Sequence, residues 1–127
     1  MKSLTKIFGS FLLPASLLFS QEKLSKELVA DLNGDGFPEK SLVCKINGKP
    51  ELRIIDGKDS LSVKKYSGFP RFSGLYLAAR KNINHLVYLV DKSGGSATGF
   101  EIFYDFANKY YYVNYSDFKK ESNPELF

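Results

Sequence analysis

The chain has 127 residues, a formal net charge of +4 and a hydrophobic fraction of 43%, which suits one globular domain and is too short for two. The excess of 18 Lys and Arg over 14 Asp and Glu is too small and too scattered to indicate a nucleic-acid-binding protein. A single Cys excludes an internal disulfide framework, and one His beside it leaves little material for a transition-metal site.

The first 20 residues are typical of a secretory signal peptide. A short segment with two lysines precedes an apolar run from Ile7 to Phe19, and Ser20 is a small residue suited to cleavage after it. A membrane-spanning helix needs about 20 apolar residues, whereas this run is shorter and contains the helix breaker Pro14. We therefore expect residues 1–20 to be removed, leaving an exported chain, periplasmic or secreted, without a membrane span.

Alternating apolar and polar residues predict strands through most of the remaining chain. The expected strands lie at residues 40–46, 51–55, 61–66, 75–79, 86–90, 100–106 and 111–115. Lys23–Val29 is the only segment with the character of a helix. The predicted fold class is all-β, with one mostly antiparallel domain of about seven strands at residues 21–120, arranged as a propeller-blade-like meander or a sandwich.

Turn residues divide these strands and mark the end of the domain. Asn47-Gly48 and Asp56-Gly57 predict hairpin turns. The uninterrupted apolar run at residues 86–90 predicts a central strand that is covered on both faces. Residues 121–127 contain Pro124 and are expected to form a flexible tail.

The strongest chemical signal is the segment that begins at Asp31. Oxygen-bearing side chains stand at its positions one, three, five and nine, and Gly36 at position six permits the sharp turn that brings them together. Crowded oxygen donors suit calcium, and without a cation the carboxylates repel one another. The expected ligands of one structural calcium ion are the side chains of Asp31, Asn33, Asp35 and Glu39 and the backbone carbonyl of Phe37.

The residues of this segment bear on two other interpretations. An EF-hand requires Glu at position twelve, where this chain has Leu42, so the loop is not an EF-hand. Asn-Gly and Asp-Gly are also ordinary turn dipeptides, so a polar turn without a metal is the alternative to a calcium site.

The segment resembles the D-x-D-x-D-G-x-x-D calcium loops of the FG-GAP and VCBS class of extracellular β-propeller repeats, in which the loop leads straight into a strand. Asn33 replaces the second Asp of that pattern and Glu39 replaces the last. The resemblance covers roughly Val29–Asp56, one repeat, and a propeller needs at least four blades, so this chain cannot close one. The resemblance implies calcium binding and a role as a surface or matrix interaction module.

A second candidate site is the small-residue segment Ser93–Gly99, which lies between two apolar strands. Glycine-rich loops hold phosphate where a helix follows, and here Phe100 opens a strand, so nucleotide binding is not expected. The segment is either a flexible hairpin connector or a protrusion that enters a partner's cleft.

A protrusion that enters a partner's cleft is what a second resemblance implies. The chain is similar to a group of small exported β proteins that inhibit lysozymes, among them periplasmic immunity proteins with one propeller-like calcium loop. These proteins place a Ser-Gly-containing loop in the active site of the peptidoglycan-cleaving enzyme. The signal peptide, the size, the single calcium loop and the Ser-Gly pair all match, whereas the disulfide that several such inhibitors carry is missing. The resemblance implies a partner-binding loop of Ser93, Gly94, Gly95 and Ser96, with Tyr104 or Tyr88 as a flanking aromatic.

Support for catalysis is weaker. Glu101 and Asp105 share one face of a strand, but four residues separate their backbones by roughly 13 Å, more than the ~9.5 Å maximum in glycosidases. Both are interpreted as solvated charges, His85 as a half-buried side chain at a strand end, and Cys44 as a small core residue.

The predicted function is that of an exported calcium-binding domain, not an enzyme, that acts by binding another protein. The most specific form is an inhibitor or immunity-type protein directed against a lysozyme-like peptidoglycan hydrolase. The alternatives are a generic FG-GAP-type or VCBS-type adhesion module and a small secreted hydrolase.

Overall fold

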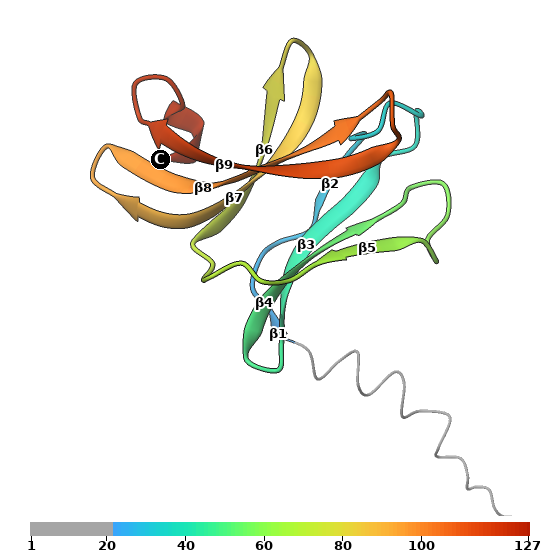
Figure 1. The fold of residues 1–127 in the computed structure, drawn as a ribbon, viewed down its shortest axis with the longest axis horizontal. Helices are drawn as coiled ribbons and strands as arrows, with labels where there is room; N and C mark the ends of the chain where they lie inside the picture. The colour runs from blue at the N-terminus through green and yellow to red at the C-terminus, as the bar shows by residue number, and fades with distance from the viewer. Residues whose placement is uncertain (1–21) are drawn as a thin grey trace, which may run out of the picture.

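The computed structural model describes residues 22–127 and has the predicted all-β class, with nine strands in two antiparallel sheets (Figure 1). The strands are β1 (Glu22–Lys23), β2 (Leu28–Ala30), β3 (Glu39–Ile46), β4 (Lys49–Ile55), β5 (Val63–Tyr66), β6 (Gly74–Arg80), β7 (Ile83–Ser93), β8 (Ser96–Asp105) and β9 (Tyr110–Lys119). The predicted signal peptide lies outside the described residues. Within residues 22–127, no helix is long and apolar enough to cross a membrane.

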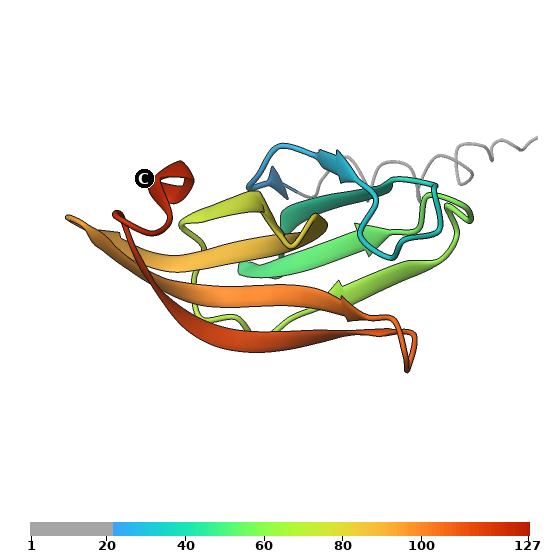
Figure 2. The ribbon, with the colours of Figure 1, turned by 90° about the horizontal axis from the view of Figure 1, so that it is seen from above.

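The two sheets have simple meander topologies. In the first sheet the order is β1-β3-β4-β5, with β2 also paired to β3, and in the second sheet it is β6-β7-β8-β9. Residues of both sheets form one hydrophobic core. Figure 2 shows the two sheets from above. The buried residues of this core are Leu32, Val43, Leu52 and Ile54 from the first half of the chain and Leu86, Tyr88, Val90 and Ile102 from the second.

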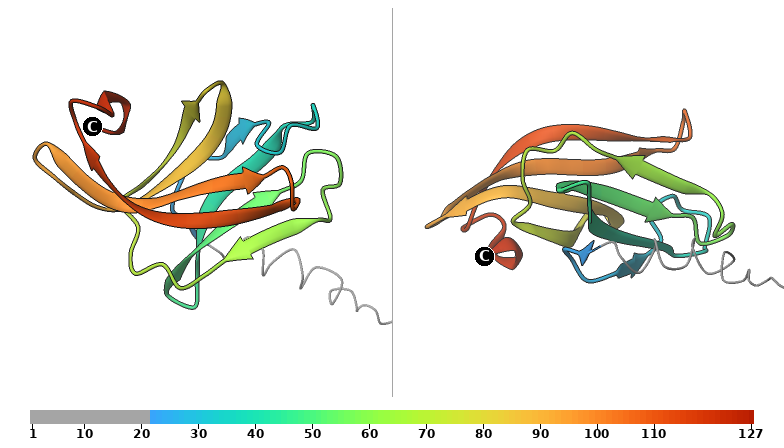
Figure 3. Two further views of the ribbon diagram at one scale, coloured as in Figure 1. Left: turned by 45° about the horizontal axis from the view of Figure 1, so that its top comes forward. Right: turned by 90° about the horizontal axis from the view of Figure 1, so that it is seen from below.

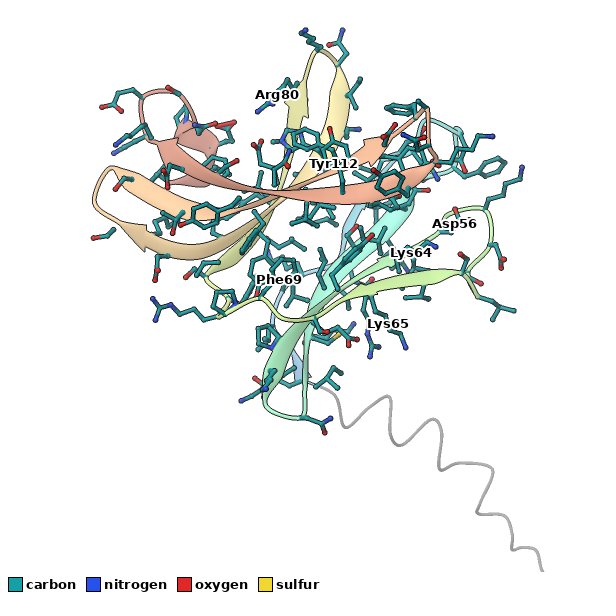
Figure 4. All side chains as sticks on the ribbon, in the orientation of Figure 1. Asp56, Lys64, Lys65, Phe69, Arg80 and Tyr112 are labelled. Carbon is teal, nitrogen blue, oxygen red and sulfur yellow. The ribbon has the colours of Figure 1, made fainter. Side chains whose placement is uncertain are left out.

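The connection between β5 and β6 closes one side of this core. Phe69 stacks on Tyr88 with ring centroids 4.3 Å apart, and Phe72 meets the same ring edge-on. Figure 4 shows Phe69 beneath the second sheet, where the chain passes from one sheet to the other.

Strand β7 is buried on both faces, as predicted for residues 86–90. Leu86, Tyr88 and Val90 face the core between the sheets, whereas Val87 and Leu89 belong to a second apolar cluster. The end of the chain covers this second cluster with a short 3-10 helix, η2 (Pro124–Leu126), seen in Figure 3 curling back beside β9.

Residues 121–127, hereafter the C-terminal segment, are therefore packed and do not form the loose tail that Pro124 suggested. Leu126 is only 2% exposed, and its backbone carbonyl accepts a 2.9 Å hydrogen bond from the Lys92 ammonium. The physical reason is that the outer face of β7 and β8 is apolar, so burying a leucine there outweighs the poor helix-forming sequence.

Of three local expectations, two differ from the structure. Lys23–Val29 is not helical, because its backbone pairs with β3 through β1 and β2. Asn47-Gly48 is a two-residue hairpin turn with positive φ at both residues, as predicted. Asp56-Gly57 instead opens a longer connection, residues 56–62, which is closed by the hydrogen bond from the Asp56 amide to the Ser62 carbonyl.

Candidate metal centre

The loop between β2 and β3 is wound by its own side chains. The Asp31 carboxylate accepts hydrogen bonds from the amides of Gly34 and Gly36, each at 2.9 Å, and Asp35 accepts one from the Phe37 amide at 2.9 Å. Gly34 and Gly36 have φ values of 76° and 86°, which L-residues rarely adopt. These contacts span two to five residues, so the curl follows from the local sequence.

The winding brings three of the predicted ligands together. Asp31, Asp35 and Glu39 each place one carboxylate oxygen within 4.8 Å of the other two, and this group could hold a metal ion. Asn33 lies in the same loop, where its side-chain oxygen accepts a 3.2 Å hydrogen bond from the Asp35 amide.

Glu39 is the buried member of the group, with 1% of its surface exposed. One of its carboxylate oxygens accepts hydrogen bonds from the amides of Leu32 and Asn33, and the other accepts one from the Gly57 amide. Burial raises the pKa of Glu39, and the nearby Asp35 carboxylate acts in the same direction, while the backbone amides oppose both. A bound cation would favour the ionised form that burial disfavours.

The connection after β4 packs directly on the loop between β2 and β3, residues 31–38, hereafter the metal loop. At Gly57 a Cβ atom would lie 2.2 Å from the Pro38 carbonyl oxygen and 2.7 Å from that of Phe37. Only glycine therefore fits at this position. The predicted ligand carbonyl of Phe37 lies against this second loop, which sequence reasoning had identified only as a turn.

The second sheet also contacts the metal loop. A Cβ atom at Gly34 would lie 2.8 Å from the ring of Phe106, which stands in the turn between β8 and β9, and the Asn84 amide donates to the Asp31 carbonyl at 3.4 Å. Figure 1 shows this turn beside the loop that precedes β3. The candidate metal centre therefore lies where both sheets meet, which no local sequence signal indicated.

A small cavity of about 150 Å³ adjoins the loop on the side of β9. Its lining includes Asn33, Asp56, Lys64, Tyr104 and Tyr111. Burial raises the pKa of Tyr111, and the carboxylates of Glu39 and Asp56 add to the rise. Figure 4 shows Asp56 and Lys64 at this end of the first sheet.

The predicted partner loop is shorter than expected. Ser93 and Ser96 are the last paired residues of β7 and β8, so only Gly94 and Gly95 form the turn, and residues 96–99 belong to a strand. All four residues, 93–96, are exposed. Strand pairing therefore continues past the apolar residues as far as Ser93 and Ser96.

The flanking aromatics do not join this turn. Tyr104 pairs with Tyr111 near the opposite end of β8, and Tyr88 is fully buried in the core. Eight residues of strand separate Tyr104 from Ser96, roughly 26 Å. The structure therefore leaves Ser93–Ser96 as a separate exposed tip, without the aromatic flank.

The sequence did not predict the polar cluster that surrounds Glu101. Glu101 is 7% exposed, not solvated, and its carboxylate bonds the imidazole of His85 at 3.0 Å, Ser116 at 2.9 Å and Arg80 at 3.1 Å. His85 is buried as well, and burial lowers its pKa more than the Glu101 carboxylate raises it. Nothing in the strand pattern shows that this outward face is covered, so the sequence offered no signal for the cluster.

Comparisons with models of protein families, with curated proteins and with solved structures find no match. The resemblance of the metal loop to FG-GAP and VCBS repeats therefore stays a prediction based on its residues.

Proposed function

We propose that this protein is an exported domain that binds one calcium ion in the loop between β2 and β3. The observation that carries the proposal is the convergence of three carboxylates within 4.8 Å in a loop turned by glycines. The proposed ligands are the side chains of Asp31, Asn33, Asp35 and Glu39 and the backbone carbonyl of Phe37.

The donor chemistry favours calcium over other cations. Every proposed ligand is a hard oxygen, which suits calcium and not a soft transition metal. Magnesium demands a smaller octahedral shell and keeps most of its water, whereas a loop with five protein ligands suits the larger ion. The role of calcium here is structural, because the ion neutralises three carboxylates at the junction of two sheets.

The test is the thermal midpoint of the purified protein in calcium, in magnesium and in chelator. Extracellular calcium modules bind at about 0.1 to 1 mM, so 10 mM calcium stabilises the protein by roughly 1.4 to 2.7 kcal/mol. For a domain of this size each kcal/mol raises the midpoint by about 4 to 8 °C. Magnesium is expected to give a much smaller rise.

Asp35→Asn is the variant for this test, since it removes a charge and keeps an oxygen that can accept the Phe37 amide. Its calcium response should be lost. Asp117→Asn, at an exposed position on β9, is the matched control and should respond like the parent. An equal midpoint in calcium and chelator for the parent would reject the calcium site.

We further propose that the domain acts by binding a protein, most specifically as an inhibitor or immunity-type protein for a peptidoglycan hydrolase. The exposed tip Ser93–Ser96, at the end of two long strands, supports this form of the proposal. A narrow tip of small residues can enter a cleft that a bulkier loop cannot. If the protein inhibits no hydrolase, the remaining form of this proposal is a generic adhesion module.

Muramidase assays with lysozymes of several types test the inhibitor. Gly95→Asp is the informative variant, because a Cβ at Gly95 makes only an ordinary 4.0 Å contact, whereas Gly94 has φ +59° and would be strained. Burying an unpaired charge in the cleft should weaken inhibition at least about tenfold. Ser60→Asp, exposed in the connection between β4 and β5, is the control. Unchanged muramidase rates with the parent across the panel would reject the inhibitor.

The cluster around Glu101 does not favour the hydrolase alternative. A serine nucleophile is activated when its hydroxyl is hydrogen-bonded to the catalytic base. Here Ser116 and His85 both bind the Glu101 carboxylate, which stands between them.

A further inference from the structure

The second sheet divides into two arms at one end. Pairing between β7 and β8 stops at Leu86 and Ile102, although β7 begins at Ile83 and β8 continues to Asp105. Beyond that point β7 pairs only with β6 and β8 pairs only with β9, so two hairpins diverge. Figure 1 shows the β6–β7 hairpin rising away from the β8–β9 hairpin.

Side chains bridge the outer face of this division and form a floor of stacked rings. The rings of His85 and Phe103 stack at 4.4 Å, and Phe103 in turn stacks on Tyr112 at 5.6 Å. The Arg80 guanidinium lies 5.3 Å above the Phe103 ring. The buried Glu101 carboxylate binds both Arg80 and His85, so it orients the guanidinium and the imidazole beside the Phe103 ring.

An open groove of about 500 Å³ lies over this floor, a volume within the range of small-molecule sites. One wall comes from the β6–β7 hairpin and the other from the β8–β9 hairpin, and Figure 4 shows Arg80 and Tyr112 on these two sides. Its lining combines aromatic side chains with planar polar groups; it includes Arg80, Lys81, Phe103, Asp105, Tyr112 and Asn114.

The charges of the groove are balanced. Arg80 is paired with Glu101, and the lining also holds one further cation, Lys81, and one further anion, Asp105, whose carboxylate accepts hydrogen bonds from Ala107 and Asn108. A polyanion such as a nucleic acid needs a continuous row of cations, which this groove does not offer. The lining instead suits an uncharged ligand that is apolar on its faces and polar around its edge.

We propose that this groove binds a short, uncharged oligosaccharide. Pyranose rings present C–H faces that pack on aromatic rings, and the exposed side of Tyr112 on the Phe103 stack offers such a surface. Sugar hydroxyls around the ring edge pair with amide and guanidinium groups, which Asn114 and Arg80 supply at the groove walls. This site is separate from the tip Ser93–Ser96 and does not depend on the proposed inhibition.

The experiment titrates the purified protein with the hexamers of β-1,4-linked glucose and of β-1,4-linked N-acetylglucosamine, followed by amide chemical shifts. We expect saturable binding of at least one hexamer with a Kd below about 1 mM, with shifts concentrated at residues 80–83 and 103–114. Tyr112→Ala should weaken binding by about fivefold or more, and Tyr112→Phe should restore it, since it keeps the ring.

The matched control is Tyr115→Ala, which removes an exposed tyrosine from the opposite face of the same strand and should bind like the parent. Asn114→Ala is a second variant in the groove. It removes an amide that pairs with sugar hydroxyls and leaves every aromatic ring in place, and it should also weaken binding. The proposal is overturned if neither hexamer binds, or if Tyr115→Ala weakens binding as much as Tyr112→Ala. Binding of an oligonucleotide or an extended peptide in place of the hexamers would overturn it in favour of another ligand class.

Discussion

Glu39 combines the features of a structural carboxylate and of a ligand. Three backbone amides satisfy its oxygens, yet burial still disfavours the charge that those amides stabilise. A carboxylate that served only to bind the amides could be replaced by a neutral amide at the cost of one hydrogen bond, because an amide has one acceptor oxygen where the carboxylate has two. A carboxylate that binds calcium cannot be replaced in this way, because the ion requires its charge.

Glu39→Gln separates these two roles. The glutamine oxygen can still accept from the Leu32 amide, but its NH2 group would face the Gly57 amide, donor against donor, so in chelator the variant should melt somewhat below the parent. In 10 mM calcium the difference from the parent should widen by the whole calcium response of the parent, because the variant has lost its own. Differential scanning calorimetry measures both midpoints. A lower midpoint in chelator than the parent, with a full calcium response, would show that Glu39 serves the fold alone.

His85 predicts a pH dependence of stability. Its folded pKa lies below its ordinary value, so the unfolded chain binds the proton more tightly. The stability that the neutral His85 imidazole contributes to the folded protein is therefore fully present above about pH 6.5. It is lost as the pH falls through the folded pKa. The charged groups that face His85 are Glu101, Arg80 and, from the C-terminal segment, Glu125.

Urea unfolding at pH 7 and pH 5.5 measures this effect. The chain has one His, so His85→Gln removes the only imidazole and should flatten the pH dependence in this window. An unchanged pH dependence in His85→Gln would assign it to the carboxylates instead.

The C-terminal segment is an element that seals one face of the second sheet. Leu126→Ala should lower the free energy of unfolding by about 2 to 5 kcal/mol, since the cavity lies among well-packed residues. Leu61→Ala is the control, because Leu61 is 91% exposed and its truncation should change stability by less than about 0.5 kcal/mol. Equal effects of the two variants in urea unfolding would show that the segment does not cover the sheet in solution.

The connection between β4 and β5 is a second element that covers another part of the structure, because Gly57 packs on the metal loop. Gly57→Ala places a methyl group against the carbonyls of Phe37 and Pro38 and should push this connection off the metal loop. We expect a lower thermal midpoint and a weaker calcium response. Gly95→Ala, which meets only an ordinary contact, should leave both unchanged. A full calcium response in Gly57→Ala would mean that the metal loop is held without this connection.

At the scale of the whole molecule, the metal loop connects the two sheets. Gly34 contacts Phe106, and Asp31 accepts a hydrogen bond from Asn84, so both arms of the second sheet touch a loop that belongs to the first. A cation in this loop should therefore stabilise residues far from its ligands in the sequence.

Hydrogen exchange in calcium and in chelator measures this connection. We expect calcium to slow exchange in β3 and β4 and also at the divided end of the second sheet, around residues 83–86 and 102–106. Asp35→Asn should abolish the difference in both places. Slower exchange restricted to residues 31–39 would show that the ion stabilises its own loop and nothing beyond it.

The sequence by itself determined the features that depend on neighbours along the chain. The metal loop is closed by hydrogen bonds over two to five residues, and the strands follow from alternation over five or six residues. The Asn47-Gly48 turn and the doubly buried run at residues 86–90 are of the same kind. Such features are readable because their physics is local.

Only the tertiary structure decided which surfaces are covered and which residues meet. Alternation places Glu101 on an outward face, and the C-terminal segment and the neighbouring strands then bury that face. Tyr104 and Ser96 stand in one strand but at opposite ends, so no common site forms. Contacts between Gly57 and Pro38, or Phe106 and Gly34, join residues far apart in the chain. The energies of these contacts depend on how strands and loops pack against one another. No short stretch of sequence specifies that packing.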